Sequence, residues 1–313
     1  MRERVRICEC FARDGLQHEQ QFIPTNVKIE LLAAFQAAGF TRIEATSYSH
    51  PERVPAFRDA SEVLRAIDRR EGVQYKATCP NVAAVRRAIA DLEAGAGADE
   101  ISLLASASEG HTQRNLRATR AEQWERIAGM VREAGHRFRL VGVISVAFGC
   151  PIDGRVDPAS VVEDAKRFVD LGVNFITLGD TTGLATPTAV QDLWRRLQAA
   201  APNVTFVAHF HNTRGSGLAN CVSALQAGCR NFDSSFGGVG GHPTRVSYGE
   251  GMTGNVSTED LVNLLEAMGF DTGLDLQRVM DASRLCESAL GRQLHSMVAR
   301  SGFGILDREP RHV

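Results

Sequence analysis

Two histidines one residue apart are the residues whose type and spacing point most directly to chemistry. His209 ends the apolar run Val204–His209 and His211 follows it, so both side chains would lie on the same face of a strand. Two neutral imidazoles placed in this way can bind one divalent ion, with the carboxylate of Asp14 as an anionic third ligand. Because no pair of thiolates accompanies them, this donor set favours Mg²⁺ or Mn²⁺ over Zn²⁺. The alternative is a hydrogen-bonded pair of histidines inside the fold.

Charged residues at the ends of other apolar runs extend this candidate site. Arg13 directly precedes Asp14, where it could face negative charge that develops on a substrate oxygen or simply pair with a carboxylate such as Glu44. Glu44 and Asp180 could each orient Arg13 or act as a base. Asp180 could instead cap the turn before Thr186-Pro187.

A glycine-rich segment, Gly237–Gly241, immediately precedes His242. Glycine permits a sharply folded or mobile loop, and an imidazole on such a lid could transfer protons near neutral pH. The alternatives are a simple connecting turn and an ordinary loop histidine. Cys8 and Cys10 lie on the first apolar run, and we interpret them as core residues rather than as a redox pair.

The elements that must position these residues are eight short apolar runs that alternate with amphipathic helical segments. The predicted strands are Val5–Cys10, Arg42–Thr46, Gln74–Thr78, Glu100–Ala105, Phe138–Ser145, Asn174–Leu178, Val204–His209 and Asn231–Ser235. The predicted helices are Val27–Ala38, Ala56–Asp68, Val82–Glu93, Ala121–Glu133, Pro158–Leu171, Pro187–Ala199, Gly217–Ala227 and an eighth from Ser257 to near Met268.

This alternation predicts a (β/α)8 TIM barrel, in which functional residues lie at the C-terminal ends of the strands. An open doubly wound sheet would favour a G-x-G-x-x-G turn after the first strand, and the residues there, Ala12–Gln17, lack it. We expect one domain over residues 1–313, with the barrel at about 5–270 and a C-terminal helical extension at about 274–298.

Composition excludes several classes of protein. The chain has 313 residues, 43% hydrophobic and 23% charged, which argues against intrinsic disorder. A net charge of −2 argues against a nucleic-acid partner. No apolar run is long enough to span a membrane, so we expect no membrane partner either. An odd number of cysteines, seven, and an N-terminus without a signal-peptide pattern lead us to expect a cytoplasmic enzyme without a disulfide framework.

Several motifs, in order along residues 5–295, resemble those of the hydroxymethylglutaryl-CoA lyase family. They are Phe11–Glu19, Phe22–Thr25, Ile43–Ser47, Phe148–Pro151, Leu178–Thr181, Ala208–Thr213 and Gly254–Leu261. The resemblance implies a metal-dependent TIM-barrel lyase that splits a 3-hydroxy-3-methylacyl-CoA by retro-Claisen cleavage. It also implies an acyl-CoA or branched hydroxy-acid substrate and a homodimer.

The resemblance further implies roles for individual residues. The metal ligands would be Asp14, His209, His211 and Asn255, Arg13 would stabilise the enolate oxygen, and Glu44 and Asp180 would support and move protons.

One loop departs from the family pattern. The family has a cysteine in its G-x-G-G-C-P loop, and His242 stands at that position here, before a longer stretch to Asn255. We therefore predict a lyase for a 3-hydroxy-3-methylglutaryl-CoA-like 3-hydroxyacyl-CoA, in which His242 supplies the proton and the products are an acyl-CoA and a keto compound. The alternatives are a 2-oxo acid aldolase or Claisen-type synthase on the same barrel, and a non-catalytic metal-binding relative.

Overall fold

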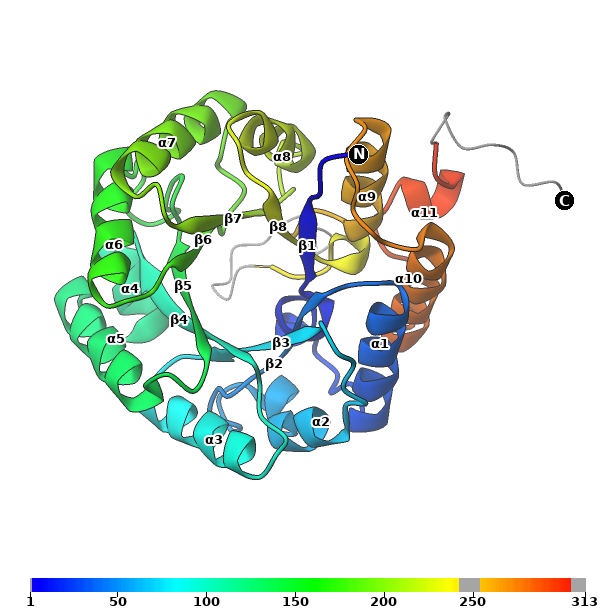
Figure 1. Cartoon of the computed structure of the whole chain (residues 1–313), viewed down its shortest axis with the longest axis horizontal. Coiled ribbons are helices and arrows are strands. Elements are labelled where there is room, and N and C mark those ends of the chain that lie inside the picture. Colours follow the sequence, from blue (N-terminus) through cyan, green and yellow to red (C-terminus); the bar gives the residue numbers. More distant parts are fainter. Residues whose placement is uncertain (1, 242–253, 305–313) are drawn as a thin grey trace, which may run out of the picture.

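A closed barrel of eight parallel strands forms the centre of the molecule (Figure 1), and this confirms the predicted (β/α)8 fold. The computed structural model describes residues 2–241 and 254–304. Each strand pairs with the next in sequence, and the first pairs with the eighth. The strands are β1 (Arg6–Glu9), β2 (Arg42–Ser47), β3 (Gln74–Cys79), β4 (Glu100–Ser106), β5 (Arg139–Ser145), β6 (Phe175–Asp180), β7 (Thr205–Phe210) and β8 (Asn231–Ser234).

Helices surround the barrel; the first eight connect successive strands, and the last three follow β8. They are α1 (Thr25–Ala37), α2 (Ala60–Ala66), α3 (Val82–Glu93), α4 (Glu109–Leu116), α5 (Arg120–Ala134), α6 (Pro158–Asp170), α7 (Pro187–Ala200), α8 (Gly217–Gln226), α9 (Thr258–Ala267), α10 (Leu276–Leu290) and α11 (Val298–Ser301). Within the two described ranges, none of them is long and apolar enough to cross a bilayer.

Several helices begin at the capping residues that the sequence indicates. The side chains of Asp157, Thr186 and Ser257 accept hydrogen bonds from backbone N–H groups in the first turns of α6, α7 and α9. In α6 and α7 a proline occupies the first helical position, where no backbone N–H is needed. The cap residues therefore define where the chain leaves the mouth of the barrel and turns back.

The structure corrects two predicted helices and adds one that was not predicted. The helix expected over Ala56–Asp68 is a 3₁₀ turn at Pro55–Phe57 followed by α2, because the Asp59 carboxylate between them binds Lys28. Helix α4 was not predicted because its sequence contains no apolar residue before its last position, Leu116; the Ser108 side chain caps it. The C-terminal helical extension stops at Leu290, where Gly291 adopts a left-handed conformation with φ 63°, and α11 follows separately.

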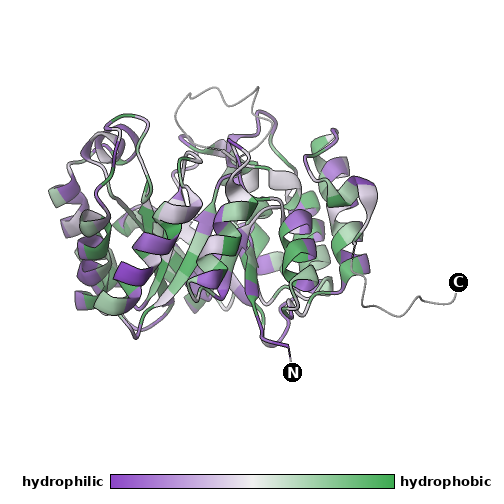
Figure 2. Ribbon diagram, turned by 90° about the horizontal axis from the view of Figure 1, so that it is seen from above, coloured by the Kyte–Doolittle hydropathy of each residue, from purple (hydrophilic) through white to green (hydrophobic). Residues whose placement is uncertain are grey.

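The main apolar core lies between the strands and the surrounding helices. Phe35 stacks on Phe236 with ring centroids 5.1 Å apart, and Phe11 and Phe40 pack edge-on against the ring of Phe35. In Figure 2 hydrophobic residues are frequent along the strands, and hydrophobic and hydrophilic residues alternate along the surrounding helices.

The interior of the barrel contains buried charges where branched apolar side chains are usual. Arg42 Nε lies 2.6 Å from Glu100 Oε2, and Arg42 Nη1 lies 3.4 Å from Asp233 Oδ1. Lys76 lies beside Asp233 in the same interior. These residues come from β2, β3, β4 and β8, so the charged layer crosses the whole barrel.

Candidate active site

Arg13 and Asp14 reach the barrel mouth on a tight π-helical turn, Phe11–Gly15, that follows β1. The backbone N–H groups of Arg13, Asp14 and Gly15 all donate to the carbonyl oxygen of Cys10. The buried Glu9 carboxylate accepts from the Phe11 N–H and stabilises the start of the turn. In a strand, Arg13 and Asp14 would point to opposite faces, whereas this turn places both side chains at the barrel mouth.

Arg13 makes close ion pairs with two carboxylates. Its Nη1 lies 2.7 Å from Asp14 Oδ1, and its Nη2 lies 2.7 Å from Glu44 Oε2. The guanidinium is 16% exposed, and its buried Nε finds no acceptor among the residues that the structure describes. The pairing that the sequence offered as an alternative is therefore present, and the Nε–H group remains available to donate to another oxygen.

Glu44, on β2, is the carboxylate that orients Arg13. Its Oε1 accepts a hydrogen bond from Thr78 Oγ1 at 2.9 Å and lies 3.6 Å from Lys76 Nζ. Burial opposes ionisation, but Arg13 and Lys76 outweigh it and lower the pKa of Glu44. Glu44 is thus held as a charged group between two cations.

Asp180, at the end of β6, serves the turn that follows it. Its Oδ1 accepts from the Leu184 and Ala185 N–H groups at 2.7 and 3.1 Å, and among the residues that the structure describes it makes no ion pair with Arg13. Burial raises the pKa of Asp180 to about 6. Its buried Oδ2 has no partner within residues 2–241 and 254–304, so it could accept a proton.

The two histidines converge at the end of β7. His209 Nε2 lies 3.2 Å from His211 Nε2, and each of these atoms lies 4.0 Å from Asp14 Oδ2. On the far side of its ring, His209 Nδ1 lies 3.4 Å from Asp233 Oδ2. Although burial acts against protonation, the carboxylates of Asp233 and Asp14 raise the pKa of His209. A hydrogen bond from Nδ1 to Asp233 would direct the Nε2 lone pair toward Asp14 and His211.

Asn255 completes this group. Its Nδ2 donates to Asp14 Oδ2 at 2.6 Å and to the Val239 carbonyl oxygen at 3.0 Å. The backbone holds Asn255 beside β7, since Asn212 N–H donates to the Gly254 carbonyl oxygen at 2.7 Å. Its Oδ1 is buried and has no hydrogen-bond partner in the described part of the chain.

These groups fit a divalent cation. One ligand atom from each of Asp14, His209 and His211 lies within 4.8 Å of the others. Asn255 Oδ1 is an additional oxygen donor without another partner. A carboxylate oxygen, two imidazole nitrogens and an amide oxygen form the mixed donor set that suits Mg²⁺ or Mn²⁺. Arg13 and the two imidazoles lower the pKa of Asp14 despite its burial, so the anionic ligand is charged.

The glycine-rich segment packs closely against this group. Gly240 has φ +118°, and a side chain there would collide with Asn255 Nδ2 and would meet the Asp14 carbonyl oxygen at 3.0 Å. Glycine at this position therefore allows the loop to approach the candidate ligands. His242 lies outside the described residues.

Two polar residues near the candidate site were not predicted. Lys76 and Asp233 lie inside the barrel, below Glu44 and His209 respectively. The sequence does indicate them, because each is a charged residue inside a predicted buried strand. The candidate site residues came only from the ends of the predicted strands. Cys8 and Cys10 are buried on the same interior, with their Sγ atoms 3.9 Å apart, and both are free thiols.

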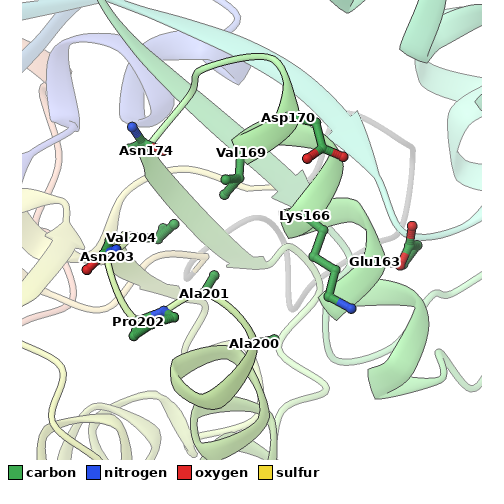
Figure 3. Close-up of a pocket in the computed structure, with 10 residues that line it drawn as sticks. All are labelled: Glu163, Lys166, Val169, Asp170, Asn174, Ala200, Ala201, Pro202, Asn203 and Val204. Carbon is green, nitrogen blue, oxygen red and sulfur yellow. The ribbon is translucent and has the colours of Figure 1, made fainter.

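A separate surface pocket of about 370 Å³ lies at the opposite end of the barrel (Figure 3). Residues that precede β6 and β7, including Asn174 and Pro202–Val204, line it together with the end of α6. The N-terminal ends of strands in this fold contribute to stability rather than catalysis.

Together, the fold and the convergent side chains define a TIM-barrel enzyme with a candidate divalent-metal site at the C-terminal ends of its strands.

Comparisons with known proteins identify the family. The family model described as HMGL-like matches residues 4–286. Mitochondrial hydroxymethylglutaryl-CoA lyase from Rattus norvegicus is 39% identical over 300 residues, covering 96% of this chain and 90% of the rat protein. Cytoplasmic 3-hydroxy-3-methylglutaryl-CoA lyase from Mus musculus is 37% identical over 302 residues, with 96% and 85% covered.

Solved structures give the same assignment. An HMG-CoA lyase from Acenitobacter baumannii, in complex with coenzyme A and 3-methylmalate, matches with a TM-score of 0.89 at 35% identity, covering 98% of this chain and 97% of the other. The hydroxymethylglutaryl-CoA lyase from Pseudomonas aeruginosa also has a TM-score of 0.89 at 35% identity, with 96% and 98% covered. The chain belongs to the hydroxymethylglutaryl-CoA lyase family and is a carbon–carbon lyase of that type.

Proposed function

We propose that this lyase cleaves a 3-hydroxy-3-methylglutaryl-CoA-like 3-hydroxyacyl-CoA by retro-Claisen chemistry, using Mg²⁺ or Mn²⁺. The observation that carries the proposal is that Asp14 contacts both the candidate metal ligands and Arg13. Its Oδ2 faces the Nε2 atoms of His209 and His211, and its Oδ1 binds Arg13. A candidate cation site and a fixed guanidinium therefore share one carboxylate. The relative solved with coenzyme A and 3-methylmalate supports a thioester substrate.

Asp14, His209, His211 and Asn255 would hold the ion. When bound, a divalent ion would polarise the substrate hydroxyl group and lower its pKa. The residues below these ligands would maintain their orientation, as Asp233 does for His209.

In the proposed reaction Asp180 Oδ2 accepts the proton of the 3-hydroxyl group. The hydroxyl carbon becomes a ketone as the adjacent carbon–carbon bond breaks, and the bonding pair moves to the thioester fragment as an enolate. Arg13, with its unpartnered Nε, donates to the enolate oxygen. A proton is then delivered to the enolate carbon, and we assign this step to His242.

The test is product analysis with a panel of 3-hydroxyacyl-CoA thioesters that includes 3-hydroxy-3-methylglutaryl-CoA. We expect turnover with Mg²⁺ or Mn²⁺ to release an acyl-CoA and a keto product in equal amounts, and His209→Ala to lose it. Release of a pyruvate-type acid from 2-oxo acid substrates alone would indicate an aldolase instead. A protein that binds one ion per chain but turns over no member of the panel would be a non-catalytic relative. Either result would overturn the proposal.

A further inference from the structure

Lys76 is a buried cation to which the proposed reaction assigns no role. It lies in the middle of β3 with only 2% of its side chain exposed. Its Nζ is 3.6 Å from Glu44 Oε1 and 3.7 Å from Asp233 Oδ2. A lysine ammonium is strongly hydrated, so it remains buried only where carboxylates replace its water.

Each of these two carboxylates contacts a different half of the candidate site. Glu44 binds Arg13 Nη2 through its other oxygen at 2.7 Å. Asp233 lies 3.4 Å from His209 Nδ1. Lys76 therefore contacts both Glu44, which binds Arg13, and Asp233, which lies beside His209.

The charges explain why this connection matters. Arg13 lies between Asp14 and Glu44, so these three groups alone carry one net negative charge. Negative charge beside Arg13 opposes formation of an enolate. The ammonium group of Lys76 offsets the charge of Glu44 from below before any cation binds. It also attracts Asp233 Oδ2, whereas Arg42 attracts the other oxygen of Asp233.

The other deeply buried lysine of the described chain shows a different arrangement. Lys28, 3% exposed, joins α1 to the start of α2 through Asp59 at 2.7 Å and the Ala56 carbonyl oxygen at 2.6 Å. These contacts lie outside the barrel and do not lead to any described residue of the candidate site. Lys76, in contrast, contacts two carboxylates that each continue to a group at the mouth.

We propose that Lys76 is a positioning residue for the lyase reaction, which holds Glu44 under Arg13 and Asp233 under His209. This inference rests on the proposed function for its catalytic consequence. It extends the machinery from the barrel mouth into a charged layer inside the barrel.

The first test compares Lys76→Met with Lys28→Met, which removes a buried lysine ion pair outside the barrel. We expect Lys76→Met to lower kcat by about 10- to 100-fold, the usual effect of losing an outer partner of this kind, while KM changes by less than about twofold. Lys28→Met is expected to lower stability and leave kcat within about twofold of wild type. A purely structural role for Lys76 would not separate kcat from KM in this way.

The second test asks whether Lys76 acts through Glu44. In a Glu44→Gln background, Lys76→Met should lower the residual kcat by a smaller factor than it does in the wild type, since one of the two carboxylates that it positions is already absent and only Asp233 remains. In urea unfolding, the unfolding constant of the double variant should differ by at least about threefold from the product of the two single effects. The unfolding experiment requires no turnover.

These outcomes separate the two proposals. If the wild-type chain cleaves no thioester of the panel, the proposed function fails and the unfolding cycle alone decides whether Lys76 is coupled to Glu44. If the wild type is active, a Lys76→Met variant with wild-type kcat overturns the positioning role and leaves the proposed function intact. Independent effects of Lys76 and Glu44 in unfolding also overturn that role.

Discussion

Replacing Arg13 with methionine removes a guanidinium that contacts both Asp14 and Glu44, at 2.7 Å each. An enolate oxygen about 4 Å from this charge would lose roughly 4 kcal/mol at an effective dielectric constant of about 20. Removal of a single oxyanion-stabilising donor typically lowers kcat by about 10²- to 10³-fold, the same order of magnitude. Because Arg13 is 16% exposed, we expect the loss to fall within that range and not above it. Steady-state kinetics with the preferred thioester measures kcat and KM.

Metal binding provides the internal control for this experiment. Arg13 is not a proposed ligand, and its removal leaves Asp14 without a competing cation, so Arg13→Met should still bind one Mn²⁺ per chain with unchanged or higher affinity. Electron paramagnetic resonance of added Mn²⁺ measures this. If Arg13→Met retains kcat within about tenfold of wild type while its metal content is intact, the assignment of Arg13 to the enolate is wrong.

Three further predictions address the other groups of the site. His209→Ala should abolish stoichiometric Mn²⁺ binding, as measured by titration and metal analysis, because it removes one of the two imidazole donors; one tightly bound ion per chain would show that the ligand set is incorrect. The pKa of Asp180 is raised to about 6, and a base must be ionised, so kcat should fall as the pH decreases through about 6. This acidic limb should disappear from the residual activity of Asp180→Asn, and a limb that persists would assign the base elsewhere. His242→Ala should lower turnover at unchanged metal content, and His242→Cys should increase cleavage of 3-hydroxy-3-methylglutaryl-CoA; full activity of the alanine variant would exclude a proton-transfer role.

Local pattern in the sequence was sufficient for most of the fold. Each of the eight strands appears as a short apolar run, and polar caps and prolines such as Asp157-Pro158 mark helix starts. These signals are local, because burial and capping depend on neighbouring residues. Helix α4 lacked such a signal: its polar sequence is stabilised by the Ser108 cap and by the bond from its Gly110 N–H to Asp153, a residue of another loop.

The candidate ligands were also accessible from sequence, since the spacing of His209 and His211 places both rings on one side of a strand and Asp14 follows the end of the first predicted strand. Sequence alone left Glu44 and Asp180 as equal candidates to orient Arg13. The tertiary structure decided for Glu44, because the π-helical turn after β1 directs Arg13 toward β2, whereas Asp180 accepts hydrogen bonds from its own loop.

Only the closed barrel revealed the charged layer beneath the site. Lys76 and Asp233 are 157 residues apart, as their numbers give (233 − 76), yet their charged atoms lie 3.7 Å apart. Strand spacing in a sequence determines which residues can face inward. It does not determine which of them meet across the barrel, because that depends on the register of all eight strands when the sheet closes.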